Sequence, residues 1–491
     1  MENKYNVRIM RSELRNFKNV NYGEVSYMNY GSINSRGVID KTDIVGIYGQ
    51  NGSGKTALVE ALDILQYIIR GFAVPYEAYA GLLSRENPSS ITTDFFIEQG
   101  PSKYKVNYVV YIRANDEKKK IEIYKEKLTY WTRGASWKSE RDLEFENPCY
   151  SNTDLLEQRS MSIVSEHMKH LNGIPFLASM QNLALICAQQ FSSVFFNTLV
   201  FKAVKELAEG EETAAFQDVI RGIMQFGLVD LNVIKVNQLG TINRNQIIPI
   251  NVHRETKTSI TQECIPLKIS GPTEIAEDNY EQVCLAIDAI NIAIRSIVPN
   301  LQIGLEKKME TEKPDGTKVI QVEIYSNRDG KCFPIRYESE GIKRIISILN
   351  YLIAVFNHPG VCLVVDEMDS GIFEYLLGEL LGLMNNEMKG QLIFTSHNLR
   401  VLEKLDAKNI VCSTVNPDNR YIRLAGIEKN NNKRDFYIRA ITVGGQKEAL
   451  YDEDDLIAMG YAFRKAGRGN QDKVNLSFSP EFEQKLQNYN N

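Results

Sequence analysis

Hydrophobic and polar positions change their spacing several times along the chain, and each spacing predicts a different kind of element. Short alternating runs predict strands at residues 5–30 and an antiparallel meander at 92–131. Across 152–230 the apolar residues take a helical spacing, whereas 231–270 again has the pattern of strands and loops. A long helix is predicted at 275–297. This order indicates a mixed α/β protein with an antiparallel β lobe and a mainly helical middle.

Three runs of apolar residues end directly in polar residues, which is typical of buried parallel strands. They cover residues 44–48, 360–365 and 391–394. Ligands bind at the carboxyl ends of such strands, so the polar residues after each run are candidates for one shared site. Between the first two runs, Asp315-Gly316 predicts the turn of a hairpin whose second strand is 319–325. No heptad repeat is sustained, and we therefore expect no long coiled coil.

The first of these runs leads into a segment with the phosphate-loop pattern GxxxxGK[ST], and a helical pattern follows it. Glycines let backbone N–H groups turn toward a phosphate, and a helix N-terminus adds partial positive charge. Lys55 is expected to reach the β- and γ-phosphates, and the Thr56 hydroxyl to bind Mg²⁺. A glycine-rich turn without a ligand is the alternative, which the strand-loop-helix context disfavours. The predicted nucleoside triphosphate site contains Gly49, Asn51, Gly52, Ser53, Gly54, Lys55 and Thr56.

The other two apolar runs supply the second half of the predicted site. Asp366 and Glu367 follow one run directly, and His397 follows the other. Asp366 is expected to hold Mg²⁺, and Glu367 to orient or deprotonate the attacking water. His397 would lie at the same edge of the sheet, where it could contact the γ-phosphate or the water. Taken singly, the two carboxylates could be a helix N-cap and the histidine a structural residue.

The segment Tyr337-Glu338-Ser339-Glu340-Gly341 precedes an apolar helix predicted at 345–355. Ser339 is a plausible N-cap of this helix. Lys343 and Arg344 in the first turns oppose the helix dipole unless an anion lies nearby. A phosphate bound to another subunit would be such an anion.

In their order along the chain, these motifs resemble the ATPase heads of the ABC/SMC-like class, over residues 5 to about 425. More narrowly, they are similar to stand-alone bacterial AAA-family ATP-binding proteins related to the ATPase half of overcoming-lysogeny-defect nucleases. The opening segment 14–19, Leu-Arg-Asn-Phe-Lys-Asn, fits the first strand and loop of that family. The resemblance implies a P-loop ATPase head with an antiparallel β lobe and a helical insertion.

The resemblance also implies a head-to-head homodimer. ATP bound at Lys55 of one subunit would be capped by Ser339 and Gly341 of the other, residues 369–371 would form the D-loop, and His397 the switch. Relatives usually carry a Leu-His-Pro-like sequence after the D-loop serine, whereas this chain has Ile372-Phe373-Glu374.

For the Q-loop glutamine of this class, Gln99 and Gln181 are the candidates in this chain. The resemblance further suggests four segments. These are residues 1–135, the first half of the head; 136–300, a mainly helical insertion; 301–427, the second half; and 428–491, an extension.

Composition limits the choice of partners. The 491 residues are 43% hydrophobic and 24% charged, which is typical of a globular protein with an ample core. A formal charge of −5 gives no overall attraction to nucleic acid or to an anionic membrane. The N-terminus lacks the apolar core of a signal peptide, and no apolar run is long enough to span a membrane. We therefore expect a cytoplasmic protein without a membrane partner.

Several scattered residues carry weaker signals. The seven cysteines form no CxxC pair and are expected to be reduced thiols. His167 and His170 could share a metal, but a solvated or capping role is favoured. The lysine run 118–120 is expected at a solvated hairpin tip rather than in a nucleic-acid patch. The basic and acidic residues after 428 are a mixed solvated surface or a docking face for a partner or DNA.

These observations predict an ATP-binding and ATP-hydrolysing switch. No nuclease or other catalytic motif appears beyond the ATP site, so an effector would be a separate polypeptide. By resemblance to anti-phage systems such as Septu and PARIS, we expect a nuclease or toxin partner. The alternative is an SMC-like ATPase of DNA repair or chromosome maintenance, which the missing coiled coil disfavours. An ABC transporter subunit is disfavoured because Glu-Ser-Glu-Gly replaces the usual Leu-Ser-Gly-Gly-Gln.

Overall fold

The computed structural model describes ten stretches of the chain. These are 5–27, 43–133, 141–146, 186–199, 211–235, 247–255, 260–314, 316–427, 432–451 and 456–467. The chain divides into two compact units, Met1–Leu450 and Tyr451–Asn491. Helix α14 (Leu456–Gly467) belongs to the second unit, and all other elements belong to the first.

A six-stranded, mainly parallel sheet forms the centre of the first unit. Its order is β18 (Tyr421–Ile422), β17 (Ile410–Ser413), β3 (Asp43–Tyr48), β16 (Gln391–Thr395), β15 (Cys362–Val365) and β8 (Leu231–Ile234). Only β18 is antiparallel to its neighbour. Nearly all residues of β3, β15 and β16 are buried, which explains their uninterrupted apolar sequences. The three strands predicted from apolar runs are therefore confirmed.

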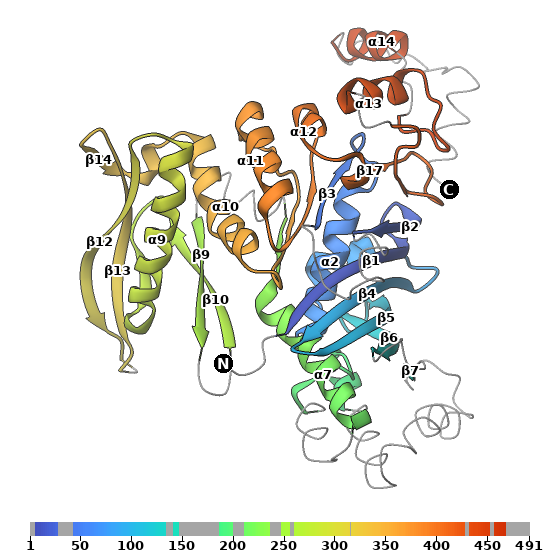
Figure 1. The fold of residues 1–491 in the computed structure, drawn as a ribbon, viewed down its shortest axis with the longest axis horizontal. Helices are drawn as coiled ribbons and strands as arrows, with labels where there is room; N and C mark the ends of the chain where they lie inside the picture. Colours follow the sequence, from blue (N-terminus) through green and yellow to red (C-terminus); the bar gives the residue numbers. More distant parts are fainter. Residues whose placement is uncertain are drawn as a thin grey trace. The chain divides into compact units, whose positions relative to one another are not determined.

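A second six-stranded sheet is antiparallel and forms the β lobe (Figure 1). Its order is β2 (Val20–Ser26), β1 (Asn6–Phe17), β4 (Ser89–Gln99), β5 (Ser102–Asn115), β6 (Lys120–Thr132) and β7 (Arg141–Glu146). The predicted meander is confirmed as β4, β5 and β6. Lys118 and Lys119 are exposed between β5 and β6, as expected for a solvated hairpin tip.

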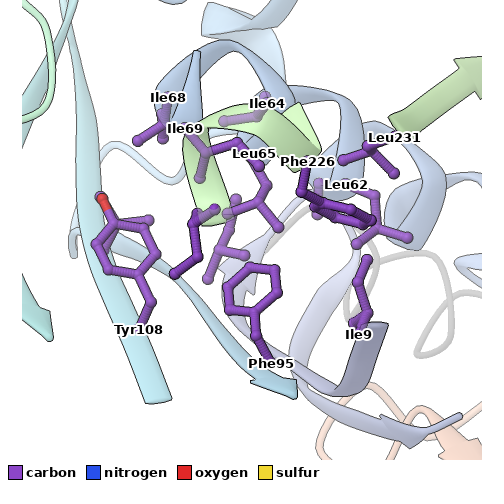
Figure 2. Close-up of a cluster of buried hydrophobic side chains, with 14 of the residues drawn as sticks. Ile9, Leu62, Ile64, Leu65, Ile68, Ile69, Phe95, Tyr108, Phe226 and Leu231 are labelled. Carbon is purple, nitrogen blue, oxygen red and sulfur yellow. The ribbon is translucent and has the colours of Figure 1, made fainter. Parts of the chain in front are cut away.

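Helix α2 (Lys55–Ile69) belongs to the hydrophobic core that joins the β lobe to one face of the parallel sheet. Figure 2 shows Leu62, Leu65 and Ile69 of this helix close to Phe95 and Tyr108 of the lobe. The same core includes residues of α7 (Glu211–Gln225) and the π-helical turn η4 (Phe226–Asp230). The short elements α3 (Tyr76–Tyr79) and η1 (Ala80–Leu82) follow α2.

A separate core covers the opposite face of the parallel sheet. Side chains alternate between the faces: Val364 and Ile393 belong to the first core, whereas Leu363 and Phe394 belong to the second. The helical elements between residues 340 and 450 of the described chain are α10 (Glu340–Asn357), α11 (Glu374–Glu387), α12 (Leu399–Lys404), η6 (Ala407–Asn409) and α13 (Lys433–Thr442). All of these except η6 contribute buried side chains to the second core.

The second core continues into a smaller layer built around α9 (Glu277–Ile297), which Figure 1 shows beside β12 and β13. Its buried face is Val283, Ile287, Ile290 and Ile294, the helical spacing expected from the sequence. The strands of this layer are β9 (Ile247–Glu255) with β10 (Ile260–Lys268), and β11 (Thr273–Ala276), β13 (Lys318–Arg328), β12 (Leu301–Glu312) and β14 (Lys331–Pro334), before the turn η5 (Ile335–Tyr337). The predicted helix and hairpin are confirmed.

The described middle of the chain contains two strands that the sequence did not predict. Between residues 136 and 300 the described part includes β7 to β11 besides α7 and α9, and β8 belongs to the parallel sheet itself. Strands β8, β9 and β10 lie within residues 231–270, where strands were expected, whereas β7 and β11 lie outside that range. His167, His170, Gln181 and Cys149 lie outside the described residues, and the four segment boundaries stay predictions.

The described residues can be searched for membrane-spanning helices and for disulfides. None of the helices there has both the length and the hydropathy needed to cross a membrane. The six described cysteines are all free thiols, in agreement with the absence of a CxxC pair.

Candidate nucleotide-binding site

The glycine-rich loop between β3 and α2 has a backbone conformation that requires glycine. Gly49, Gly52 and Gly54 have φ angles of 155°, 80° and 88°, in the region that disfavours residues with a side chain. A Cβ atom on Gly49 would lie 2.0 Å from the Ser413 Oγ atom. Helix α2 begins at Lys55 with Gly54 as its N-cap, and no side chain caps it. The loop therefore leads into a helix N-terminus, as the phosphate-loop pattern predicts.

Residues from both ends of the chain hold this loop in place. The Tyr421 hydroxyl donates to the Gly54 carbonyl oxygen at 2.7 Å, and the Ser413 hydroxyl donates to the Tyr48 carbonyl oxygen at 3.1 Å. Ser413 also shares a hydrogen bond with the Ser53 hydroxyl. From the β1–β2 turn, the Asn19 amide donates to the Gly52 carbonyl oxygen. Hydrogen bonds from residues far away in the sequence therefore hold the loop in its conformation.

Lys55 is buried within the loop that it terminates. Its Nζ atom donates to the carbonyl oxygens of Gly49 and Gln50, both at 2.8 Å. Burial lowers the pKa of Lys55, and the nearby carboxylates of Asp366, Glu367 and Asp369 oppose that effect. The ammonium group is therefore close to the carboxylates that follow β15.

The structure brings Asp366 and Thr56 together. The Thr56 hydroxyl lies 3.5 Å from Oδ1 of Asp366, which also accepts a hydrogen bond from the Thr395 hydroxyl at 2.5 Å. Asp366 is fully buried, and its Oδ2 atom has no hydrogen-bond partner among the described residues. A free carboxylate oxygen beside a threonine hydroxyl fits Mg²⁺, which prefers oxygen ligands and takes few of them from protein. Within the described ranges, no three His, Cys, Asp or Glu side chains group to hold a metal by themselves.

Glu367 has a strained backbone directly after Asp366. Its φ angle is 48°, in the left-handed region that a non-glycine residue occupies only when the surroundings enforce it. The Glu367 N–H donates to the Thr395 hydroxyl at 2.8 Å, so Thr395 contacts both the predicted metal ligand Asp366 and the predicted catalytic residue Glu367. This role of Thr395 was not predicted from the sequence. Its position at the carboxyl end of β16 was the signal that could have revealed it.

His397 lies at the same edge of the sheet, two residues beyond β16. Its backbone N–H donates to Oδ2 of Asp369 at 3.1 Å. The pKa of His397 is lowered, first by partial burial and then by the Lys55 charge, while the three nearby carboxylates oppose the shift. At neutral pH the imidazole is therefore uncharged, and it can offer one donor and one acceptor nitrogen.

Ser339 and Gly341 lie at the start of α10. Ser339 is exposed and is the N-cap, and its hydroxyl accepts a hydrogen bond from the Ile342 N–H at 3.4 Å. A Cβ atom on Gly341 would lie 2.8 Å from the Gly371 carbonyl oxygen, so the helix start packs closely on the loop after β15. Among the described residues, no hydrogen bond joins Ser339 to the glycine-rich loop of the same chain.

The structure argues against one predicted residue. Gln99 ends β4 opposite Ser102 in a hairpin of the β lobe. The preceding residue, Glu98, pairs with Asn6, and Arg8 of the same strand bonds to Asp43 at the amino end of β3. Gln99 therefore lies toward the end of the parallel sheet opposite the glycine-rich loop, where it cannot act as the Q-loop glutamine. The alternating pattern of its strand gave no information about which end of the central sheet it would reach.

A parallel sheet that carries a glycine-rich loop, a following helix and a carboxylate after another strand of the same sheet defines a mixed α/β P-loop NTPase. Residues 44–166 match a family model described as "AAA domain, putative AbiEii toxin, Type IV TA system". That match covers β3, the loop and α2, whereas Asp366 and His397 lie outside it. The predicted fold class, a P-loop NTPase with an antiparallel β lobe, is confirmed. The search among curated proteins found no match.

Solved structures similar to this chain include head domains of SMC proteins. The SMC head domain from Thermotoga maritima is 12% identical, with 85% of this chain and 100% of that chain covered at a TM-score of 0.32. An Smc head domain with a coiled coil and joint from Pyrococcus yayanosii is 12% identical to this chain. The match covers 88% of this chain and 99% of that chain, with a TM-score of 0.39. An SmcHead bound to the C-winged helix domain of ScpA is 12% identical to this chain. The match covers 85% of this chain and 98% of that chain, with a TM-score of 0.35.

Proposed function

We propose that the protein is an ATP-hydrolysing switch whose composite sites form between two copies of the chain. The observation that carries this proposal is the free Oδ2 atom of buried Asp366 beside the Thr56 hydroxyl, next to a glycine-rich loop. That arrangement suits a nucleotide with its magnesium ion better than any structural role. An unbonded buried carboxylate oxygen destabilises the free protein, and a ligand would remove the penalty.

Each group at this edge of the sheet has a role in hydrolysis under this proposal. Lys55 exchanges its two carbonyl partners for phosphate oxygens, and Thr56 and Asp366 hold Mg²⁺. When bound there, Mg²⁺ would neutralise charge that develops on the phosphates. Glu367 orients or deprotonates the attacking water, and neutral His397 hydrogen-bonds to the γ-phosphate or to that water.

A second copy of the chain would supply Ser339 and Gly341 to the bound ATP. The exposed start of α10 supports this arrangement, because a helix N-terminus attracts phosphate. Two aromatic side chains near it are also exposed, Tyr337 at 68% and Phe373 at 73%. Exposed aromatic residues are typical of protein interfaces.

The switch would control a separate effector, a nuclease or toxin, in an anti-phage system. The description of the matching family supports a toxin-linked role, because it names a toxin and a TA system. Under this proposal, ATP closes the dimer and hydrolysis reopens it, so the effector responds to the nucleotide state.

Glu367→Gln tests the proposal, because it keeps the shape of the side chain and removes the base. We expect ATP turnover to fall by about 100- to 1,000-fold, while ATP binding persists and an ATP-dependent dimer accumulates. The matched control is Glu387→Gln, at the exposed end of α11, with turnover unchanged. Undiminished turnover in Glu367→Gln would refute the assigned role.

The same variant, co-expressed with its genomic neighbour, tests the effector. Mass and composition are measured with and without ATP. An ATP-dependent complex with a nuclease-like or toxin-like neighbour supports the anti-phage role. A homodimer that ignores the neighbour and binds DNA would favour an SMC-like repair or chromosome-maintenance ATPase instead.

A further inference from the structure

Arg344, in the second turn of α10, has a buried guanidinium group that makes no hydrogen bond to any described residue. The residue is 2% exposed, and Nε, Nη1 and Nη2 all lack a hydrogen-bond partner among the described residues. Burial lowers the pKa of Arg344 to about 10, and the charges of Asp369 and Glu367 oppose that shift. The guanidinium therefore stays charged at neutral pH, and its electrostatic neighbours are the carboxylates of the loop after β15.

Asp369 has a matching unused atom. One carboxylate oxygen, Oδ2, accepts the His397 backbone N–H at 3.1 Å. The other, Oδ1, is buried and has no partner among the residues that the structure describes. Two opposite charges thus interact electrostatically, but no direct hydrogen bond joins them.

The two elements that carry these groups are in contact. The Gly371 carbonyl oxygen would lie 2.8 Å from a Cβ atom on Gly341, and a Cβ atom on Gly371 would lie 4.0 Å from the Cβ atom of Arg344. A small rotation or shift of α10 against the loop would therefore change the distance between the guanidinium and Oδ1. Small shifts of this kind are how packed elements switch between discrete arrangements.

An unbonded buried guanidinium is costly to the state that contains it. Taking a charge out of water without replacing its hydrogen bonds is strongly unfavourable. Buried unsatisfied groups in native structures call for a functional or strain-related explanation. The strained backbone of Glu367, in the same loop, is a second sign that this region is held away from its relaxed geometry.

We propose that Arg344 is a positioning residue whose guanidinium pairs with Oδ1 of Asp369 when the nucleotide site closes. The pairing would fix the loop that carries Asp366 and Glu367 and, through the Asp369–His397 bond, the switch histidine. This inference deepens the proposed function and rests on it. Since Ser339 begins the same helix and would contact the partner's nucleotide, Arg344 would transmit occupancy of the partner's site to Glu367 of its own chain.

Arg344→Met tests this role, because it keeps side-chain length and removes the charge. We expect ATP turnover to fall by about 10- to 100-fold, with the ATP dissociation constant changed less than about threefold. The urea midpoint of the nucleotide-free protein should stay equal or rise, because the variant loses an unbonded buried charge. A purely structural arginine would give the opposite pair of results, a lower midpoint with unchanged turnover per folded molecule, and that would overturn the proposal.

A double-mutant cycle with Asp369→Asn isolates the pairing. The turnover of the double variant should differ by at least about fivefold from the value expected if the two single effects were independent. The shifts in the urea midpoint of the nucleotide-free protein should instead be additive. Arg344→Lys should restore part of the turnover, because it returns the charge without the planar fork. Additive effects on turnover would overturn the pairing.

The added stability on ATP binding separates this inference from the proposed function. ATP with Mg²⁺ should raise the urea midpoint of the wild type more than that of Arg344→Met. A wild type that neither hydrolyses ATP nor gains stability from it would contradict both proposals. If the wild type hydrolyses ATP and is stabilised by it, and Arg344→Met matches it in both measurements, only the role of Arg344 would be overturned.

Discussion

The two ends of the central parallel sheet differ in the hydrogen bonds that their buried charged side chains make. At the amino ends of the strands, Arg8 bonds to Asp43 at 2.6 Å and to the Lys389 carbonyl oxygen. The Gln391 side chain exchanges two hydrogen bonds with the Ile9 backbone, at 2.7 and 3.1 Å. At the carboxyl ends, Arg344, Asp366 and Asp369 each retain buried polar atoms without a hydrogen bond among the described residues.

This difference distinguishes groups that stabilise the fold from groups kept for a ligand or for another state. Arg344 and Arg8 are both 2% exposed, so burial alone does not separate them. What separates them is that Nη1 and Nη2 of Arg8 are hydrogen-bonded, whereas no guanidinium nitrogen of Arg344 has a hydrogen-bond partner among the described residues. In open α/β sheets the ligand lies at the carboxyl ends, where Arg344, Asp366 and Asp369 lie here.

Arg8→Met should give the largest effect and tests the amino end. It leaves Asp43 buried without its cation, and burial already raises the pKa of Asp43 against the influence of Arg8. We expect a loss of about 3–5 kcal/mol in the free energy of unfolding, measured with urea. ATP turnover per folded molecule should not change. An unchanged or raised free energy of unfolding, as expected for Arg344→Met, would remove the contrast between the two ends.

Thr395→Val should have an intermediate effect, because it removes one hydroxyl that bonds to both Asp366 and Glu367. We expect a loss of about 1–3 kcal/mol in the free energy of unfolding, together with at least a tenfold loss of turnover. Thr93→Val in the β lobe is the matched control, since the buried Thr93 hydroxyl has no hydrogen-bond partner among the described residues. That control should be neutral or slightly stabilising, and equal losses in both variants would contradict the assigned bonds.

His397 should give the smallest effect, visible as a pH dependence of stability. Because its pKa is lowered in the folded protein, the unfolded chain binds the proton more tightly. The folded state should therefore lose stability as pH falls through about 6.5 toward the lowered folded value. For an exposed residue we expect a few tenths of a kcal/mol between pH 7.5 and 5.5. His397→Gln should lack this component, and an unchanged pH slope would contradict it.

The parts of the site that depend only on neighbouring residues could be predicted from the sequence. The glycine-rich loop, the β3 strand before it and the Ser339 cap were predicted because each depends on neighbouring residues. The bond from Thr395 to Asp366 joins residues 29 positions apart, and the bond from Tyr421 to Gly54 spans 367. Such pairs depend on strand order, which the pattern of apolar residues does not specify. For the same reason, the sequence could not exclude Gln99 as a candidate for the Q-loop glutamine.

The order of the strands has a consequence for how the site is made in the cell. Strand β3 lies between β16 and β17, whose residues 391–413 come more than 340 positions later in the chain. The tyrosine that holds Gly54 comes later still, at residue 421. During synthesis the glycine-rich loop is made long before the strands that flank it. The ability to bind nucleotide is therefore acquired only after those strands and Tyr421 have been made.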